Sequence, residues 1–575
     1  MARRYFNWKL AIVMVIGLVV LSITAYGLRQ WQRSRGAGRG LEAGNKAYNE
    51  RKWEEAAREL GRYLTVASND VPTLLKYADA QLNIRPTKRS NVRQAIEAYR
   101  NILRTDENNS EAAIRLAEVY LGMGMPGEAE LIAGRALETS QSPKLRRMLA
   151  VALANQRKFK EAAEELKAII KEYPEQILAY GVLGQLIEQR PADFSQAPQF
   201  WFDEAVKNNP SAAEAYIIRG AYYLRHRDRV KALADLEQAE KQDLSDPSIR
   251  LRLAMEFINT NALDKAEEHL VAVQMAEPAN QALWQAWARL ALRSQSKAKM
   301  LKVAETGLKE LSSQPWDFML VAAELFIRCG RLDSANDCIS KLRQKDIAPA
   351  TVAFLEGLVA DQKQQGYEAV ECWRRAMQLG NKSPQIRLAI VSALSRLGDM
   401  QSALQQLRTL VSERPDFLNG RLAFARMLAQ TGDWAGAAEQ ARMASQISPD
   451  SLNAALLYIR TRIQLLQQSQ ADKDFPIWQD INEQLARLEN ATNGALEVRL
   501  LQFQLAMRLG NFTDAEALVT ELKKAYPSQI KVAMAEVELL TTQDKTDEAI
   551  LKLYDVSDAF PQSIIPLRYL ATLLA

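Results

Sequence analysis

Alanines that recur every 34 residues constrain this chain more than any other feature of its sequence. The interval separates Ala232 from Ala266 and each neighbouring pair in the series Ala335, Ala369, Ala403 and Ala437. Prolines keep the same interval in the pairs Pro315 and Pro349, Pro415 and Pro449, and Pro527 and Pro561. A fixed period of this length indicates an array of identical supersecondary units stacked in chain order.

Each of several periodic alanines is preceded, twelve positions earlier, by another small residue. Gly44 precedes Ala56 in this way, and Gly220 precedes Ala232. Two helices can cross closely where both carry a small residue, while larger side chains around the crossing fill the groove. A short turn with an aromatic residue follows the first helix, as in Gly-Asp-Trp at 432–434. The pattern therefore predicts a helical hairpin in every unit, closed by a proline that cannot continue the second helix.

The repeated residues resemble those of the tetratricopeptide-repeat family. One unit carries Tyr180, Leu183, Gly184 and Pro210, and the unit at 421–449 carries Ala425, Leu428, Gly432, Trp434, Ala437, Ala444 and Pro449. The resemblance implies an all-α fold, a tetratricopeptide-repeat α-solenoid superhelix of about 14–15 helical hairpins over residues 41–575. It also implies that the chain binds other proteins.

Four units depart from the regular period. The second has about five extra residues around Pro86, the fifth is stretched between Pro191 and Pro198, and the eighth carries Met300 where alanine is expected. The largest departure is the irregular stretched unit at 451–493. Its polar run at 467–474 is expected to lengthen a turn, which is either a tolerated surface loop or a partner site.

Residues 10–28 contain no charged side chain and are long enough to cross a bilayer as one transmembrane helix. A short basic tail at 1–9 precedes this segment, and a flexible basic tether at 29–40 follows it. The alternative is a cleaved signal peptide, whose apolar core is usually shorter. Arginine and lysine on both sides nearly cancel the positive-inside rule. A short basic tail favours a periplasmic solenoid, anchored by a single pass in a bacterial inner (plasma) membrane.

The composition argues against catalysis and against nucleic-acid binding. The net charge is +5 over 575 residues, without the concentrated basic face of a nucleic-acid-binding protein. His226 and His269 are expected to be ordinary surface or partly buried residues, and the cysteines, at 329, 338 and 372, small buried hydrophobes. No Gly-rich phosphate loop, nucleophile elbow or metal-binding histidine pair occurs, so no enzyme activity, cofactor or metal is expected.

The residue five positions after the small residue of each first helix defines a polar ladder. We expect it to point toward the concave face, where amide and guanidinium groups can bind an extended peptide. The alternative is that these side chains only solvate the helix ends. The ladder consists of Asn49, Asn83, Asn155, Gln189, Arg225, Asn259, Arg293, Arg328, Arg396, Gln430 and Arg508.

These features predict a membrane-anchored scaffold for protein–protein interactions, with unidentified peptide or domain partners. Bacterial envelope proteins of this layout assist protein quality control or the assembly and export of surface polysaccharide. A secreted soluble adaptor and the substrate arm of an enzyme complex remain alternatives. Residues 562–575 form an apolar C-terminal helix, which either covers the last hairpin or docks on a partner or a second copy.

Overall fold

The computed structural model describes residues 37–84, 87–311, 315–469 and 476–574, and all regular elements in these ranges are helices. The chain divides into two units, Met1–Leu355 and Glu356–Ala575. The predicted transmembrane segment 10–28 lies outside the described residues. Within the described ranges, no helix has both the length and the apolar character needed to cross a membrane.

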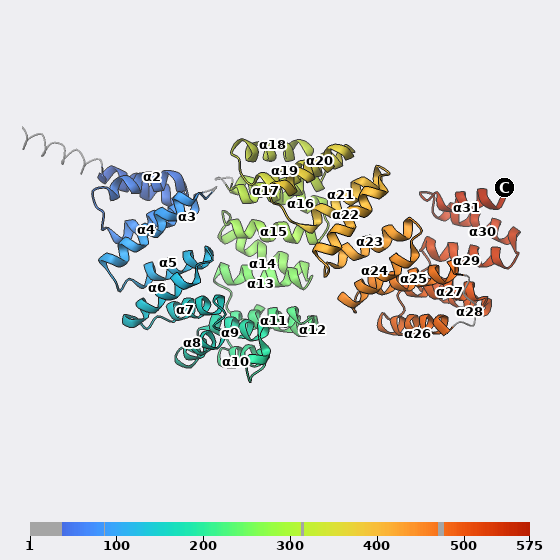
Figure 1. Cartoon of the computed structure of the whole chain (residues 1–575), viewed down its shortest axis with the longest axis horizontal. Coiled ribbons are helices and arrows are strands. Elements are labelled where there is room, and N and C mark those ends of the chain that lie inside the picture. The colour runs from blue at the N-terminus through green and yellow to red at the C-terminus, as the bar shows by residue number, and fades with distance from the viewer. Residues whose placement is uncertain (1–36, 85–86, 312–314, 470–475, 575) are drawn as a thin grey trace, which may run out of the picture. The chain divides into compact units, whose positions relative to one another are not determined.

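Unit 1 is a stack of helical hairpins in chain order (Figure 1). Its helices are 37–49, α2 (Trp53–Leu64), α3 (Val71–Asn83), α4 (Arg89–Thr105), α5 (Ser110–Gly122), α6 (Pro126–Thr139), α7 (Pro143–Asn155), α8 (Phe159–Glu172), α9 (Ile177–Gln189), α10 (Pro198–Asn208), α11 (Ala213–Arg225), α12 (Arg229–Glu240), α13 (Pro247–Asn259), α14 (Leu263–Ala276), α15 (Gln281–Arg293), α16 (Lys297–Glu310), α17 (Trp316–Arg328) and α18 (Leu332–Gln344). The predicted solenoid of hairpins is confirmed.

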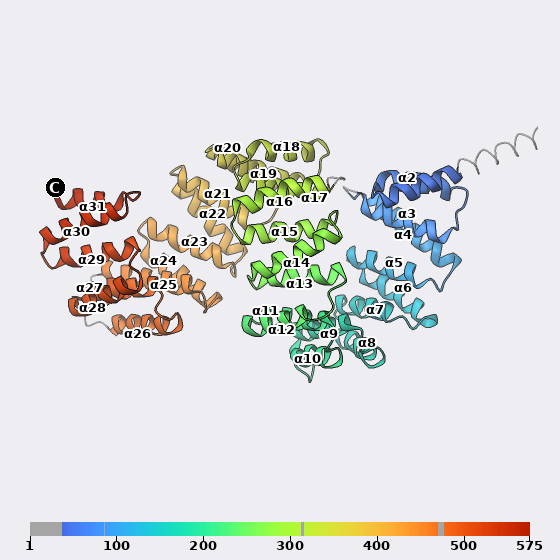
Figure 2. The same ribbon diagram turned by 180° about the vertical axis from the view of Figure 1, so that it is seen from behind.

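Unit 2 continues the same arrangement, and α19 (Pro349–Gln362) contains the boundary (Figure 2). Its helices are α20 (Gly366–Gln378), α21 (Pro384–Arg396), α22 (Met400–Glu413), α23 (Leu418–Gln430), α24 (Trp434–Ile447), α25 (Leu452–Gln468), α26 (Pro476–Ala491), α27 (Leu496–Leu509), α28 (Phe512–Ala525), α29 (Ile530–Thr542), α30 (Thr546–Ala559) and α31 (Ile565–Leu574). Together, the described helices from 37–49 to α30 form fifteen pairs.

Helices pack against their neighbours in sequence. In each unit a helix contacts the next one, and first helices also contact each other, as α11 does with α13 and α13 with α15. At the crossings a small residue receives a large side chain from the second helix. A Cβ atom on Gly184 would lie 2.5 Å from the ring of Phe202, which is 1% exposed. A Cβ atom on Gly220 would lie 3.3 Å from the carbonyl oxygen of Ala232, so the twelve-residue spacing of small residues reflects the same close approach.

The turn inside most of the hairpins depends on one residue in the left-handed region. This residue is Arg51, Arg157 or Arg227 in some hairpins and Gly432 or Gly510 in others, with φ between 57° and 86°. In the turn at 432, the backbone N–H of Asp433 donates to the carbonyl oxygen of Leu428 at 2.9 Å. The left-handed residue reverses the chain within three residues and satisfies carbonyl groups at the end of the first helix.

The irregular units keep the hairpin and absorb their extra residues locally. The stretched fifth unit contains a short 3-10 turn, η1 (Pro191–Asp193), before α10. In the unit at 451–493, α25 and α26 have 17 and 16 residues, so the extra residues also lengthen the helices. Met300 is buried in α16. Residues 37–40, expected within the flexible tether, are helical instead.

The C-terminal helix α31 covers the last hairpin with only one of its faces. Leu570 is buried against Val537 and Leu553. Ile565 and Leu567 on the same helix are more than half exposed. Self-association through this exposed side stays a prediction.

The close crossing in the fifth hairpin predicts a position-specific loss of stability. Gly184→Ala should lower the unfolding free energy by about 1–3 kcal/mol, because the new methyl group overlaps the buried ring of Phe202. Gly134→Ala in α6 is the matched control. Its Cβ meets no atom within 4 Å, so it should be neutral or stabilising by up to about 1 kcal/mol. Urea denaturation of both variants measures the difference, and equal effects would contradict the proposed crossing.

Candidate functional site

The predicted ladder residues lie at the C-terminal ends of first helices. Ten of the eleven are the last residue of their helix, and Arg508 is the last but one of α27. All are exposed except Asn83, which is half-buried. Asn49 and Asn83 line one pocket together with residues much later in unit 1, such as Ala279 and Trp316, whereas Arg225 lines a different one. Whether the ladder binds a peptide therefore stays a prediction.

Acidic neighbours pair with three of the five ladder arginines. Arg225 forms an ion pair with Glu188 at 2.9 Å. Arg328 pairs with Glu324 at 2.7 Å, and Arg396 pairs with Asp361. In the described part of the chain, Arg293 and Arg508 have no such carboxylate partner. The ladder is therefore less cationic than its residue types suggest.

A groove of about 460 Å³, here called groove 1, runs across the first helices α9, α11, α13 and α15 of unit 1. It is lined by apolar residues, by amide and guanidinium groups and by one carboxylate, among them Gln185, Ile217, Ala221, Arg225, Leu251, Arg252, Met255, Glu256, Gln285 and Arg289. Because successive first helices contact each other, this is the inner face of the helix stack. Its shape suits an extended segment that crosses several hairpins.

The lining of groove 1 follows the repeat at two positions that the sequence analysis did not select. Ile217, Leu251 and Gln285 each lie three residues before the small residue of their helix. Ala221, Met255 and Arg289 each lie one residue after it. The 34-residue spacing within each set was the signal that could have found them.

Two charged groups of groove 1 form no ion pair within the described residues: Glu256, which accepts a hydrogen bond from the side-chain amide of Asn259 at 3.1 Å, and Arg289. Arg289 is exposed, and its Nη1 lies 3.9 Å from the sulfur of Met255. Among the described residues, no carboxylate forms an ion pair with it. Arg252, by contrast, pairs with Glu214 at 2.5 Å, and Arg225 pairs with Glu188. Groove 1 thus combines apolar side chains with one guanidinium group, of Arg289, and one carboxylate, of Glu256, that form no ion pair in the part of the chain that the structure describes.

A second groove of about 430 Å³, here called groove 2, crosses α25, α27, α29 and α31 of unit 2. Leu500, Met534 and Ile565 contribute its apolar surface. Glu538 also lines it, and desolvation by the surrounding groove raises the pKa of this carboxyl group. A cationic group on a bound segment would favour the ionised form of Glu538.

The histidines and cysteines do not form a reactive site. His226 ends α11, where its Nε2 lies 2.9 Å from Glu188 Oε1. Cys338 is buried as expected, but Cys329, which follows the last residue of α17, and Cys372 on α20 are only half-buried. Within the described ranges, no group of three or more His, Cys, Asp or Glu residues is placed to hold a metal ion.

His269 is more buried than expected, at 6% exposure. Its ring stacks on Phe257 with a centroid distance of 5.6 Å, and its Nε2 lies 3.2 Å from Glu240 Oε1. Desolvation lowers the pKa of His269 below its ordinary value, although Glu240 acts in the opposite direction. The folded chain therefore favours the neutral ring.

Comparisons with known proteins identify the repeat. Sequence models of the tetratricopeptide repeat match residues 88–142, 388–451 and 500–564. The chain therefore contains tetratricopeptide repeats, and its fold is that of a tetratricopeptide-repeat scaffold. No curated protein matches the sequence.

Several solved structures are similar to this chain at low sequence identity. The APC/C hetero-tetramer Cut9–Hcn1 is 12% identical with a TM-score of 0.36, over 89% of this chain and 98% of that one. Yeast Tom70 is 13% identical with a TM-score of 0.39, over 77% and 98%. A tetratricopeptide repeat protein from Parabacteroides merdae is 15% identical with a TM-score of 0.33, over 44% and 100%.

Burial of His269 predicts a pH-dependent stability. In the unfolded chain, His269 binds a proton near its ordinary pKa of 6.5, whereas in the folded chain the pKa of His269 is lower. The unfolding free energy should therefore fall as the pH drops below about 6.5, until the lowered folded pKa is reached. Urea unfolding at about pH 7.5 and 5.0 should show a smaller difference for His269→Gln than for the wild type. His226→Gln, at an exposed histidine, should retain the wild-type difference; an equal reduction in both variants would exclude His269 as the cause.

Proposed function

We propose that this chain is a membrane-anchored, non-enzymatic scaffold that binds extended segments of other proteins in groove 1. The observation that carries the proposal is the composition of the groove. Ile217 of α11 and Leu251 and Met255 of α13 offer apolar contacts from two consecutive first helices, and Arg289 of α15 adds an unpaired positive charge. Such a surface favours a segment with aliphatic side chains and a nearby carboxylate.

The membrane part of the proposal rests on the sequence. Residues 10–28 are uncharged and long enough to span a bilayer as a single helix. We place the solenoid in the periplasm of a bacterium, anchored in the inner membrane, where it would serve envelope assembly, quality control or polysaccharide export. A secreted adaptor released by signal cleavage is the alternative, and it differs in its mature N-terminus.

Site-specific photo-cross-linking tests groove 1. The cross-linking residue p-benzoylphenylalanine at Met255 should capture a protein in native membranes, because this side chain lines the groove. Met275, on α14, is 82% exposed and serves as the matched control position, where we expect no discrete product. Adding Arg289→Glu should reduce capture at Met255 by about tenfold if an acidic segment is bound, the loss of about 1.4 kcal/mol of binding. Equal products at both positions would exclude groove 1 as the binding site.

Alkaline extraction of native membranes tests the anchor. The full chain should stay in the membrane pellet, because a spanning apolar helix is not released when electrostatic contacts are lost. N-terminal sequencing of the mature protein should find residues that precede the apolar segment. A soluble product that begins near Gly27 would establish the secreted adaptor instead.

A further inference from the structure

Positive charge is concentrated at one end of this chain. Residues 1–105 contain 19 Lys and Arg against 8 Asp and Glu, whereas residues 106–575 contain 55 against 61. The small net charge of +5 therefore conceals a basic N-terminal part followed by a slightly acidic remainder. The first hairpins therefore carry an excess of positive charge that the rest of the solenoid lacks.

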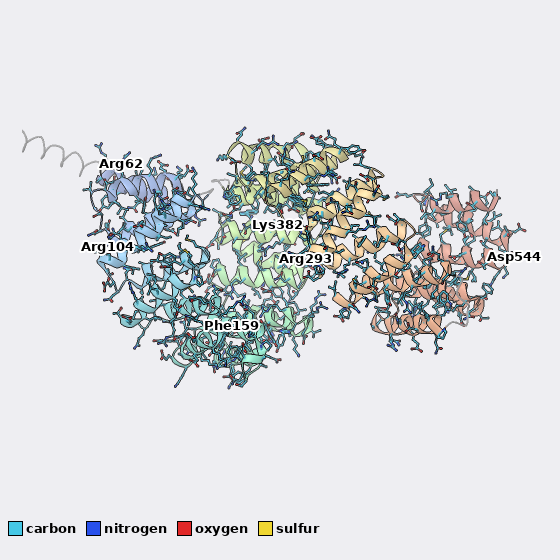
Figure 3. All side chains as sticks on the ribbon, in the orientation of Figure 1. Arg62, Arg104, Phe159, Arg293, Lys382 and Asp544 are labelled. Carbon is cyan, nitrogen blue, oxygen red and sulfur yellow. The ribbon has the colours of Figure 1, made fainter. Side chains whose placement is uncertain are left out.

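In the structure, the arginines of α4 form a stripe along one side of the helix. Arg89, Arg93, Arg100 and Arg104 are all exposed. At 100° per residue they fall within an arc of about 60°. Figure 3 labels Arg104 on α4 and Arg62 on the neighbouring α2. We call these five residues, Arg62, Arg89, Arg93, Arg100 and Arg104, the arginine face.

Few carboxylates neutralise the arginine face. Arg62 shares Glu59 with Arg58, at 3.0 Å from each. Arg104 donates to the amide oxygen of Asn101, and Arg100 to the hydroxyl oxygen of Tyr120. Within the described residues, Arg89 and Arg93 form no ion pair. Glu97, an exposed carboxylate of α4, lies four residues after Arg93 and three before Arg100 and lines the same surface, but in the described structure it forms no ion pair with either. The guanidinium groups therefore retain charge for an external anion.

The surface between α2 and α4 is hollowed. A shallow groove of about 490 Å³ separates the two second helices, and its lining includes Thr65, Tyr77, Arg93, Gln94 and Arg104. Arginines on its wall can bind phosphate through paired N–H donors, and the hydroxyl and amide groups add neutral donors. These groups suit many small anionic head groups better than a single apolar ligand.

The position of this face in the chain indicates the source of the anions. Only eight residues, 29–36, separate the predicted membrane segment from the helix at 37–49. Even fully extended, they reach at most about 29 Å. The first hairpin is therefore held near the bilayer surface, which for anionic lipids attracts arginine over roughly a Debye length.

We propose that the arginine face binds the anionic phospholipid surface of the membrane that holds the chain. This contact rests on the proposed membrane anchoring and adds a second attachment, beside the predicted helix 10–28. It also leaves groove 1 free, because groove 1 is formed by the first helices α9 to α15, whereas the arginine face belongs to the second helices α2 and α4.

Arginine footprinting of the full chain in lipid nanodiscs tests the proposal. Phenylglyoxal labelling, read by peptide mass spectrometry, is compared between phosphatidylcholine alone and phosphatidylcholine with phosphatidylglycerol. The anionic lipid should slow labelling of the arginine face at least about threefold, and about 0.5 M salt should abolish this protection. Arg508, exposed and without an ion pair in the described structure, is the internal control and should label equally in both lipids. Equal labelling of Arg93 and Arg104 in both lipids would overturn the proposal.

Two triple variants that lose the same charge test whether the protection depends on the arginine face itself or only on the net charge of the chain. Arg89→Gln/Arg93→Gln/Arg104→Gln should reduce the protection of the remaining Arg62 and Arg100. Arg293→Gln/Arg408→Gln/Arg508→Gln removes the same charge from exposed positions elsewhere and should leave that protection unchanged. Equal effects of both variants would indicate net charge alone and would also overturn the proposal.

Two further outcomes would show which of the two proposals has failed, the anchor or the lipid contact. If the chain does not enter nanodiscs, the anchor proposal fails, and the same footprint with added vesicles of the two compositions still decides whether the face binds anionic lipid. If soluble polyglutamate protects the arginine face and anionic lipid does not, the face serves an acidic protein and the lipid proposal is wrong.

Discussion

The structure depends on close crossings between a small residue of one helix and a large side chain of the next. A hairpin of two short helices cannot bury its apolar side chains alone, so its stability comes from the hairpins on either side. Gly184 illustrates the constraint, since the ring of Phe202 occupies the space where a side chain would begin. The same geometry sets the separation between successive first helices and hence the width of the groove that they line.

This nearest-neighbour packing allows the surfaces of the chain to differ without disturbing the core. Groove 1 combines apolar residues with Arg289, groove 2 contains the desolvated Glu538, and the arginine face lies on the opposite helices of the first hairpins. Each surface uses positions that point away from the crossings. A change of charge at one of them should therefore leave the stability of distant hairpins nearly unchanged.

The sequence predicted the fold because the period and the small residues at the crossings follow directly from hairpin packing. It predicted the site only in part. The ladder positions follow the correct helices but lie at their last residues, whereas the lining of groove 1 lies nearer the middle, at Met255 and its repeats. Which turn of a helix faces a groove depends on how adjacent hairpins are rotated, and a one-dimensional period does not contain that rotation. The ion pair of Arg225 with Glu188 joins residues 37 positions apart, so residue type alone did not reveal it.

The net charge of the chain likewise failed to predict a local feature of its surface. The net charge of +5 argued against a basic face, and for the chain as a whole it is small. Three-dimensional placement changes the conclusion, because Arg89, Arg93, Arg100 and Arg104 share one side of α4, and Arg93 and Arg104 line a shallow groove beside α2. A local excess of charge acts over roughly a Debye length, about 8 Å at physiological ionic strength, so its neighbours within that distance determine its effect.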